Sequence, residues 1–447
     1  MISRKINRRR LIQGTAGLTT AVAASSTFYV PMINAQEKQP VTAWTTHGDD
    51  DLESIRGIVE EFNAQSTTTE VKLEQVPGSE TDSAKLITAV RGGTGPDAYM
   101  LDRFVVPERA ANGLLQDLTP LLEGVDFDPD LKSTYIEFAA NEASYQGLPY
   151  ALPFDSDARG LYVNVDLLTE AGADPAAYTL DADPVTWDEF KEVMAKLNVE
   201  ADSGNFERFG FVPWMEQGWH YTYGFSWGAD FFDEEACEVT PDSEQMIAAM
   251  QWIYDYSMEF GPDKMQAAIT VQEGAPPSEN PFVTNRVGAM ITGDWWIKLM
   301  ERYAPDLNYQ IAKIPVPEAG MESATWAGGW SWVVPQGAKN PEGAAEFLIY
   351  AAGEPGQAIY TRDTAHLPTV AALMSQEDLY DPTHLEFTNV LLPLAKNRPP
   401  LPVGAKYWDE LTAAYERIYL NEQEPAESLA QAKENTMTLL SQFCPIE

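Results

Sequence analysis

Histidine and cysteine are scarce in this chain of 447 residues. It contains two cysteines and four histidines, which are His47, His220, His366 and His384. No two histidines have the spacing of a zinc site, and the sequence has no glycine-rich phosphate loop, nucleophile elbow or Cys–His arrangement. We therefore expect no catalytic residue, no metal site and no cofactor, and predict that the protein is not an enzyme.

Basic residues are also few. Lysine and arginine number 29 against 68 aspartates and glutamates, which gives a formal net charge of −39. Nucleic-acid binding needs a basic patch, and none is visible, so we expect no nucleic-acid partner. No internal run of about 20 apolar residues exists, so we expect no membrane-spanning helix in the mature protein. Acidic side chains spread over solvated faces are typical of a soluble protein in a saline exterior.

The N-terminus is the one basic segment. Five lysines and arginines among the first ten residues precede a small-residue apolar stretch over residues 11–24. This pattern predicts an export signal over residues 1–35, and residues 7–13 resemble the twin-arginine type. A general secretory signal or a basic tail is the alternative. No cysteine lies near the cleavage region, so we expect a soluble protein of the periplasm or extracytoplasmic space, where Cys237 and Cys444 have the chance to pair.

The first part of the mature chain alternates strands and helices. Residues 41–44, 70–75 and 98–101 have the composition of strands, and residues 55–62 and 86–90 place apolar side chains on one helical face. This βαβαβ order predicts parallel strands with right-handed crossovers. Ligands of such α/β sheets bind beyond the carboxyl ends of the strands.

A second α/β series begins near residue 160. Residues 161–164, 209–212 and 287–291 are predicted strands, and residues 214–219 a loop rich in aromatics. Between the two series, residues 148–168 form two apolar runs interrupted by Asp155, Asp157 and Arg159. Charges inside a buried strand are costly unless paired. The segment is therefore either a surface loop or a crossing between two lobes, with carboxylates facing a cleft.

Tryptophans recur next to polar residues at the predicted strand ends. Trp44, Trp219, Trp295 and Trp330 fall just after a strand or within a crossing, and their neighbours in sequence are Asp49, Glu216, Asp294 and Gly329. A sugar presents C–H faces that stack on indole and hydroxyls that donate to carboxylates. This placement predicts a carbohydrate site. The alternative for each single tryptophan is an anchor in the hydrophobic core.

Several short motifs, in order and spacing, resemble the extracellular solute-binding proteins of ABC importers, in the maltose-binding-protein-like group. The motifs include Gly95-Pro96-Asp97, Leu101-Asp102-Arg103-Phe104, Thr186-Trp187-Asp188-Glu189-Phe190, Gly288-Ala289-Met290 and Asn340-Pro341. The resemblance implies two α/β lobes joined by crossing hinge segments, the type II periplasmic-binding-protein fold. It places residues 36–155 and 330–376 in the first lobe and residues 156–329 and 377–447 in the second.

The resemblance also implies partners and ligand residues. The lobes would close over a mono- or oligosaccharide and deliver it to the membrane permease subunits, with the binding protein acting as a monomer. The positions that match ligand contacts are Trp44, Asp49, Asp102, Arg103, Asp157, Glu216, Trp219, Trp295 and Trp408, with Tyr407 as an alternative to Trp408. The pattern of tryptophans next to polar residues adds Asp294 and Trp330 as predicted ligand residues.

Two other functions fit parts of the sequence. The wider family also binds phosphorylated polyols such as glycerol phosphate, which would require Arg103, Arg159 or Arg362 to converge on an anion. A secreted glycosidase would use Asp155 or Asp157 with a second carboxylate across the cleft. The negative net charge argues against the first alternative, and the absence of an isolated acid pair argues against the second.

Overall fold

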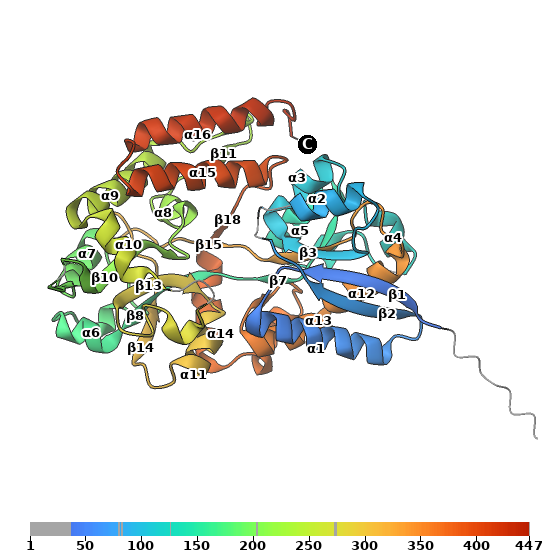
Figure 1. Cartoon of the computed structure of the whole chain (residues 1–447), viewed down its shortest axis with the longest axis horizontal. Helices are drawn as coiled ribbons and strands as arrows, with labels where there is room; N and C mark the ends of the chain where they lie inside the picture. Colours follow the sequence, from blue (N-terminus) through green and yellow to red (C-terminus); the bar gives the residue numbers. More distant parts are fainter. Residues whose placement is uncertain are drawn as a thin grey trace, which may run out of the picture. The chain divides into compact units, whose positions relative to one another are not determined.

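A computed structural model describes residues 37–78, 81, 84–125, 127–202, 204–271 and 275–446. The export signal predicted for residues 1–35 lies outside these ranges. The described chain contains two five-stranded sheets, each with its own helices (Figure 1). No helix in these ranges is both long and apolar enough to cross a membrane.

The first sheet has the strand order β2-β1-β3-β16-β6. Its first three strands are parallel, as the βαβαβ pattern predicted, and β16 runs antiparallel between β3 and β6. The strands are β1 (Gln39–Thr45), β2 (Thr69–Gln75), β3 (Ala98–Asp102), β6 (Ala151–Pro153) and β16 (Trp330–Val333). The helices along this part of the chain are α1 (Asp49–Gln65), α2 (Ala84–Arg91), α3 (Val106–Ala111), α4 (Thr119–Glu123), α5 (Glu137–Glu142), α12 (Pro341–Ala351) and α13 (Glu354–Thr364).

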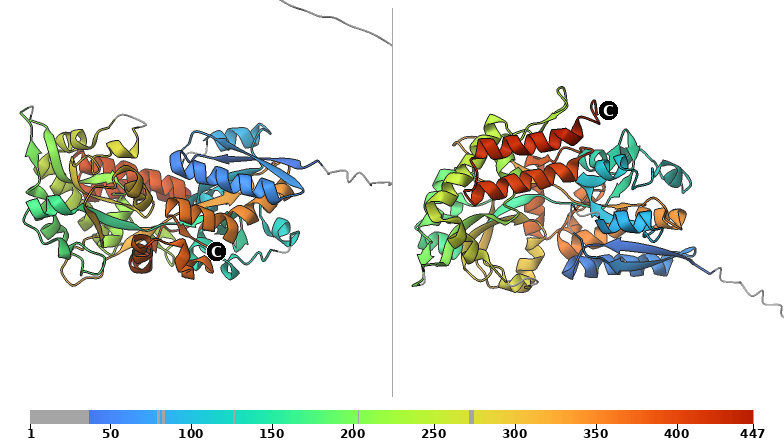
Figure 2. Two further views of the ribbon diagram at one scale, coloured as in Figure 1. Left: turned by 90° about the horizontal axis from the view of Figure 1, so that it is seen from below. Right: turned by 45° about the horizontal axis from the view of Figure 1, so that its top comes forward.

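The second sheet has the order β14-β8-β13-β10-β9. Its strands are β8 (Arg159–Asn164), β9 (Val199–Glu200), β10 (Phe206–Glu216), β13 (Val287–Gly293) and β14 (Tyr309–Ala312). The helices of this part are α6 (Val165–Glu170), α7 (Trp187–Ala195), α8 (His220–Ser226), α9 (Glu244–Phe260), α10 (Pro262–Ile269), α11 (Trp296–Tyr303), α14 (Pro382–Leu391), α15 (Gly404–Tyr419) and α16 (Pro425–Leu440). The last two helices lie beside α9, and they stay with this sheet in two further views (Figure 2).

Short paired strands connect the two sheets. β7 (Asp155–Ser156) pairs with β17 (Leu367–Pro368), and β15 (Thr325–Ala327) pairs with β18 (Ala395–Asn397). In Figure 1, β7, β15 and β18 run between the two groups of elements. Within the segment 148–168, which the sequence left as either a loop or a crossing, residues 151–164 are therefore a buried crossing between the two sheets.

Two further pairs of short strands lie outside the sheets, β4 (Ser144–Tyr145) with β5 (Leu148–Pro149) and β11 (Phe232–Asp233) with β12 (Glu238–Val239). One local prediction was wrong. Trp214, Met215 and Glu216 belong to β10 and not to a loop, because a register shift between Phe211 and Glu216 lets the strand continue along β13. Glu216 takes up this irregularity with a φ of 55°.

Candidate functional site

A cavity of about 190 Å³ lies where the crossings meet the ends of both sheets. It is reached by residues from the loop after β1, from the start of α1, from the end of β3 and from the three crossing regions. Its walls consist of His47, Asp51, Asp102, Asp157, Arg159, Gln217, Trp219, Trp295, Trp326, Gly329, Trp330, His366, Arg398 and Trp408. Six of the residues predicted from the sequence are among them.

Five tryptophans form most of the apolar wall. The Trp219 ring centroid lies 5.5 Å from that of Trp408, which in turn lies 6.2 Å from that of Trp326. On other sides of the cavity, Trp330 meets His47 edge-on at 4.3 Å, and Trp295 stacks on His366 at 5.4 Å. Trp219, Trp295 and Trp330 are only half-buried, so part of each indole remains free for a ligand. Such faces favour flat C–H surfaces.

Two arginine–aspartate pairs provide the charged wall. The Arg398 guanidinium donates to Asp102 at 2.8 Å, and that of Arg159 donates to Asp157. Both guanidinium groups also lie over the Trp326 ring, at 5.1 and 3.5 Å from its centroid. Since each arginine already has a carboxylate and an aromatic partner, the pairs offer hydrogen-bonding edges to a ligand and little net positive charge.

A third group of polar side chains surrounds His366. Its Nδ1 lies 3.6 Å from Asp155 Oδ2, and its Nε2 lies 3.8 Å from Asp51 Oδ1. Burial lowers the pKa of His366, and burial raises the pKa of Asp155 well above its usual value. Behind Trp295, the wholly buried Asp294 has a raised pKa for the same reason, with the nearby Asp157 adding to the effect. Water exclusion therefore disfavours charge at these three groups.

The structure places five of the predicted ligand residues off this cavity. Asp49 lines a neighbouring hollow of about 210 Å³ that shares Asp51 and Trp295 with it. Trp44 points elsewhere: its indole donates to Glu74 at 3.1 Å and lies under Lys85. Glu216 accepts from Asn280 at 2.7 Å. Asp294 accepts from the backbone of Trp295 instead of facing the cavity.

Arg103 is the fifth, and it acts as a structural tie. It is 0% exposed and forms an ion pair with Glu142 at 2.9 Å. Its remaining donors bind backbone carbonyls of the crossings, including those of Asp155 and Gly328 at 2.6 Å. A matching position in a family motif could not distinguish this role from ligand contact, because both need an arginine at the end of β3.

Arg103, Arg159 and Arg362 do not converge on one point, as the predicted phosphate site would require. Arg103 is used internally and Arg159 is paired with Asp157. Arg362 is exposed on α13 and does not line the cavity. The phosphorylated-polyol alternative therefore loses the feature on which it depended.

Sequence reasoning missed six residues of the wall: His47, Asp51, Gln217, Trp326, His366 and Arg398. Trp326 and His47 could have been predicted from the sequence, since both lie within two or three residues of a predicted strand end or crossing. His366 and Arg398 had no such signal, because each reaches the cavity from a short strand that forms only by pairing with a distant crossing.

Comparisons with known proteins converge on one family. A profile described as bacterial extracellular solute-binding protein matches residues 47–358. The galactooligosaccharide-binding protein of Bacillus subtilis is 22% identical, covering 86% of this chain and 87% of that protein. The lactose-binding protein of Rhizobium radiobacter is 24% identical, covering 75% of each.

Solved structures share the fold. The mannobiose-bound structure of CpMnBP1 superimposes with a TM-score of 0.78 at 24% identity, covering 89% of this chain and 99% of that one. A tagatose-bound solute-binding protein from Thermotoga lettingae gives a TM-score of 0.73 at 22% identity, covering 90% and 100%. These likenesses confirm the two-lobed α/β fold that the sequence predicted.

Proposed function

Because this chain belongs to the bacterial extracellular solute-binding protein family, we propose that it is the solute-binding component of an ABC importer and binds a mono- or oligosaccharide. The ligand occupies the tryptophan-lined cavity, and the closed protein delivers it to the permease subunits in the membrane. Residues 36–155 and 330–376 form one lobe, residues 156–329 and 377–447 the other, and the protein works as an exported monomer in the periplasm or extracytoplasmic space, without a nucleic-acid partner.

One observation carries this proposal. Half-buried indole rings of Trp219, Trp295 and Trp330 surround the same 190 Å³ space as the Asp102–Arg398 and Asp157–Arg159 pairs. Indole faces stack on the C–H surfaces of a sugar ring, and carboxylate and guanidinium edges accept from and donate to its hydroxyls. A charge-assisted hydrogen bond contributes roughly 1.5–3 kcal/mol and a stacked ring roughly 0.5–1.5 kcal/mol, so two such bonds with two stacked rings can reach micromolar affinity, about −8 kcal/mol.

A binding protein releases its ligand chemically unchanged. Asp157 is held by Arg159 and by the backbone of Gly328, and Asp155 is held by the backbone of Trp330. Asp157 is engaged by Arg159, and Asp155 does not line the cavity, so neither is placed to protonate a leaving group there. The family comparison supports the same non-enzymatic role.

A thermal-shift screen of sugars, polyols and sugar phosphates tests the proposal. A sugar ligand at 100 times its Kd stabilises the protein by about 2.7 kcal/mol, and it is recovered intact after incubation. Stabilisation by sugar phosphates alone would contradict the carbohydrate assignment. Recovery of shortened oligosaccharides would contradict the non-enzymatic role.

A further inference from the structure

The cavity wall contains more carboxylates than cations. Asp51, Asp102 and Asp157 line it, and two of them have arginine partners. Among the described residues, the only basic side chain within ion-pair reach of Asp51 is the imidazole of His366, at 3.8 Å, and burial disfavours its charged form. Asp51 is thus the one acidic group of the wall without a permanent positive partner.

A second observation concerns Asp155, which lies near the other ring nitrogen of His366. Asp155 is 1% exposed; its Oδ1 accepts from the Trp330 backbone, whereas its Oδ2 has no hydrogen-bond partner in the described chain. The Nδ1 atom of His366 is also without one, since it lies 3.6 Å from Asp155 Oδ2, too far for a hydrogen bond. Burial disfavours charge on both groups, and neither buried atom is open to the cavity, so His366 gives Asp51 no positive partner. Asp51 is therefore the carboxylate of the wall to which a cationic ligand can donate.

The chemistry of the wall narrows the class of ligand that can bind beside Asp51. A metal ion is disfavoured, because the described residues contain no group of three or more His, Cys, Asp or Glu side chains able to hold one. An anion is disfavoured, because both arginines are already neutralised. An organic cation fits, because indole faces attract positive charge and unpaired carboxylates accept its N–H groups.

We propose that the sugar bound here carries a protonated amino group, which lies beside Asp51. The inference rests on the proposed function and adds the class of sugar. A cavity of about 190 Å³ is smaller than the roughly 300–1,000 Å³ of pockets for drug-sized ligands, so one amino-sugar ring fills it. Further rings of a longer ligand would extend into the neighbouring hollow that shares Asp51 and Trp295.

Matched sugars test this directly. Isothermal titration compares glucose, glucosamine and N-acetylglucosamine, and the corresponding galactose and mannose series, at one ionic strength. In each series the three sugars share a ring, and only the amine is charged. We expect the amine of at least one series to bind about tenfold more tightly than both neutral members. If a neutral member binds as tightly as the amine in every series, the inference fails while the proposed function stands. If none of these sugars binds while a neutral oligosaccharide of the thermal-shift screen does, the inference fails. If no sugar of either set binds, the proposed function fails as well.

A pair of variants locates the effect. Asp51→Asn should bring the ratio of the two Kd values, neutral over amine, close to one. Glu53→Gln is the control, since it removes the same charge from the same helix at an exposed position outside the cavity. It should retain the wild-type ratio. Equal ratios in both variants would overturn the placement of the amine at Asp51, and the comparison of sugars on the wild type does not depend on either variant folding.

Discussion

At the scale of single residues, Trp295 is the most informative position of the site. Its half-buried ring stacks on His366, lies 5.6 Å from the Arg159 guanidinium and separates the main cavity from the neighbouring hollow. The sequence predicted its role from its position after the Gly-Ala-Met strand. The structure adds that it follows directly on Asp294, which is 0% exposed and accepts from the backbone N–H of Trp295.

Trp295→Ala should weaken sugar binding about tenfold, because it removes a stacking surface worth roughly 1–1.5 kcal/mol. The melting temperature of the ligand-free protein should change little, since the ring is half-exposed. Titration calorimetry and thermal unfolding measure the two effects. Trp214→Ala is the control: this ring is equally half-buried but stacks on Tyr419, away from the cavity, so sugar affinity should stay at the wild-type value. A drop of many degrees in ligand-free Trp295→Ala would show a core residue.

The buried His220 is expected to make the folded protein less stable as the pH falls. His220 lies in α8 against Trp408 and Tyr221, and burial lowers its pKa to about 3, with Arg398 adding to the effect. Above pH 6.5 it is neutral in both folded and unfolded chains. Below pH 6.5 only the unfolded chain binds the proton, until the folded value is reached. The stability that neutral His220 contributes is therefore lost as pH falls from 6.5, by roughly 1 kcal/mol per pH unit.

His220→Phe should remove this loss while keeping an aromatic ring. We expect the free energy of unfolding of the wild type, minus that of the variant, to fall by roughly 1–2 kcal/mol between pH 6.5 and 5. Urea unfolding at intervals of half a pH unit measures it. The other titrating groups are common to both proteins and cancel in the difference. A difference that does not vary with pH would contradict the assignment.

At the scale of elements, local sequence signals were the most dependable. The Thr186–Glu189 capping box begins α7, and Asn340 with Pro341 begins α12. These signals act within one helical turn, so they do not need the rest of the fold. The extent of β10 was missed because a strand's length depends on its partner, here β13.

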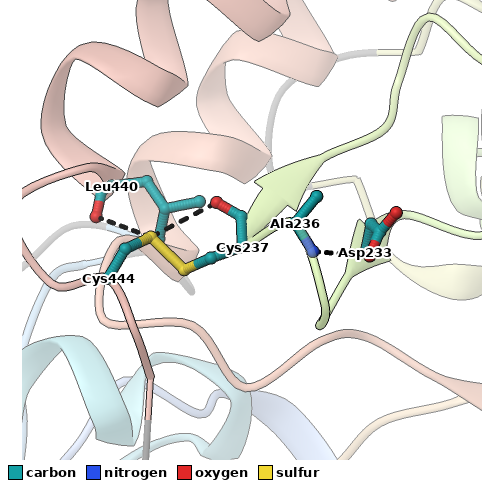
Figure 3. Close-up of a disulfide and its surroundings, with 5 residues drawn as sticks. All are labelled: Asp233, Ala236, Cys237, Leu440 and Cys444. Atoms are coloured by element: carbon teal, nitrogen blue, oxygen red, sulfur yellow. Dashed lines mark hydrogen bonds between the residues drawn. A yellow bond between two sulfur atoms is a disulfide. The ribbon is translucent and has the colours of Figure 1, made fainter.

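A disulfide bond links the turn between β11 and β12 to the segment after α16. Cys237, between β11 and β12, forms a disulfide with Cys444, which follows α16 and lies near Leu440 (Figure 3). The bond joins positions 207 residues apart, so it restricts the unfolded chain strongly. The sequence left this pairing open, because two cysteines carry no information on geometry.

Replacing both cysteines by serine should lower the free energy of unfolding by about 2–4 kcal/mol, chiefly through the unfolded state. Urea unfolding under non-reducing conditions measures the change, and the wild type with reductant should approach the variant. Sugar affinity should remain the same, because neither cysteine lines the cavity. Equal stability of variant and wild type would show that the bond does not form in solution.

At the scale of the whole molecule, charged side chains bridge elements of the two lobes near the mouth of the site. Arg302 of α11 forms an ion pair with Asp50 of α1, and Lys298 lines the same surface hollow. Helix α1 packs with the first sheet, and α11 follows β13 of the second sheet. The proposed closure of the lobes over the ligand would bring these two side chains together, so we expect this ion pair to favour the ligand-bound arrangement.

Arg302→Glu should raise the sugar Kd by a factor of about 3–10, because it replaces attraction by repulsion across the mouth of the cleft; exposed pairs contribute up to about 1 kcal/mol. The effect should shrink at 1 M salt, where charges are screened beyond roughly 3 Å. Titration calorimetry at two salt concentrations checks both points. Asp50→Lys combined with Arg302→Glu restores the pair with reversed polarity and should recover most of the affinity. Failure of the double variant to recover would assign the loss to packing.

The sequence by itself determined the fold class, the capped helices, the parallel strands of the first sheet and the kind of chemistry at the site. Those features depend on periodicity, on local hydrogen bonds and on residue types that occur near strand ends. Six of its predicted ligand residues share one cavity, among them Asp102, Asp157 and Trp295.

Only the tertiary structure decided which charges are free to meet a ligand. Arg103 and Asp157 are equally plausible in sequence, yet Arg103 is enclosed by Glu142 and backbone carbonyls, whereas Asp157 reaches the cavity. Arg398 and His366 enter the site through strands paired across more than 60 and 200 residues. Burial and partnership of a charge are set by residues distant in the chain, and no local pattern encodes them.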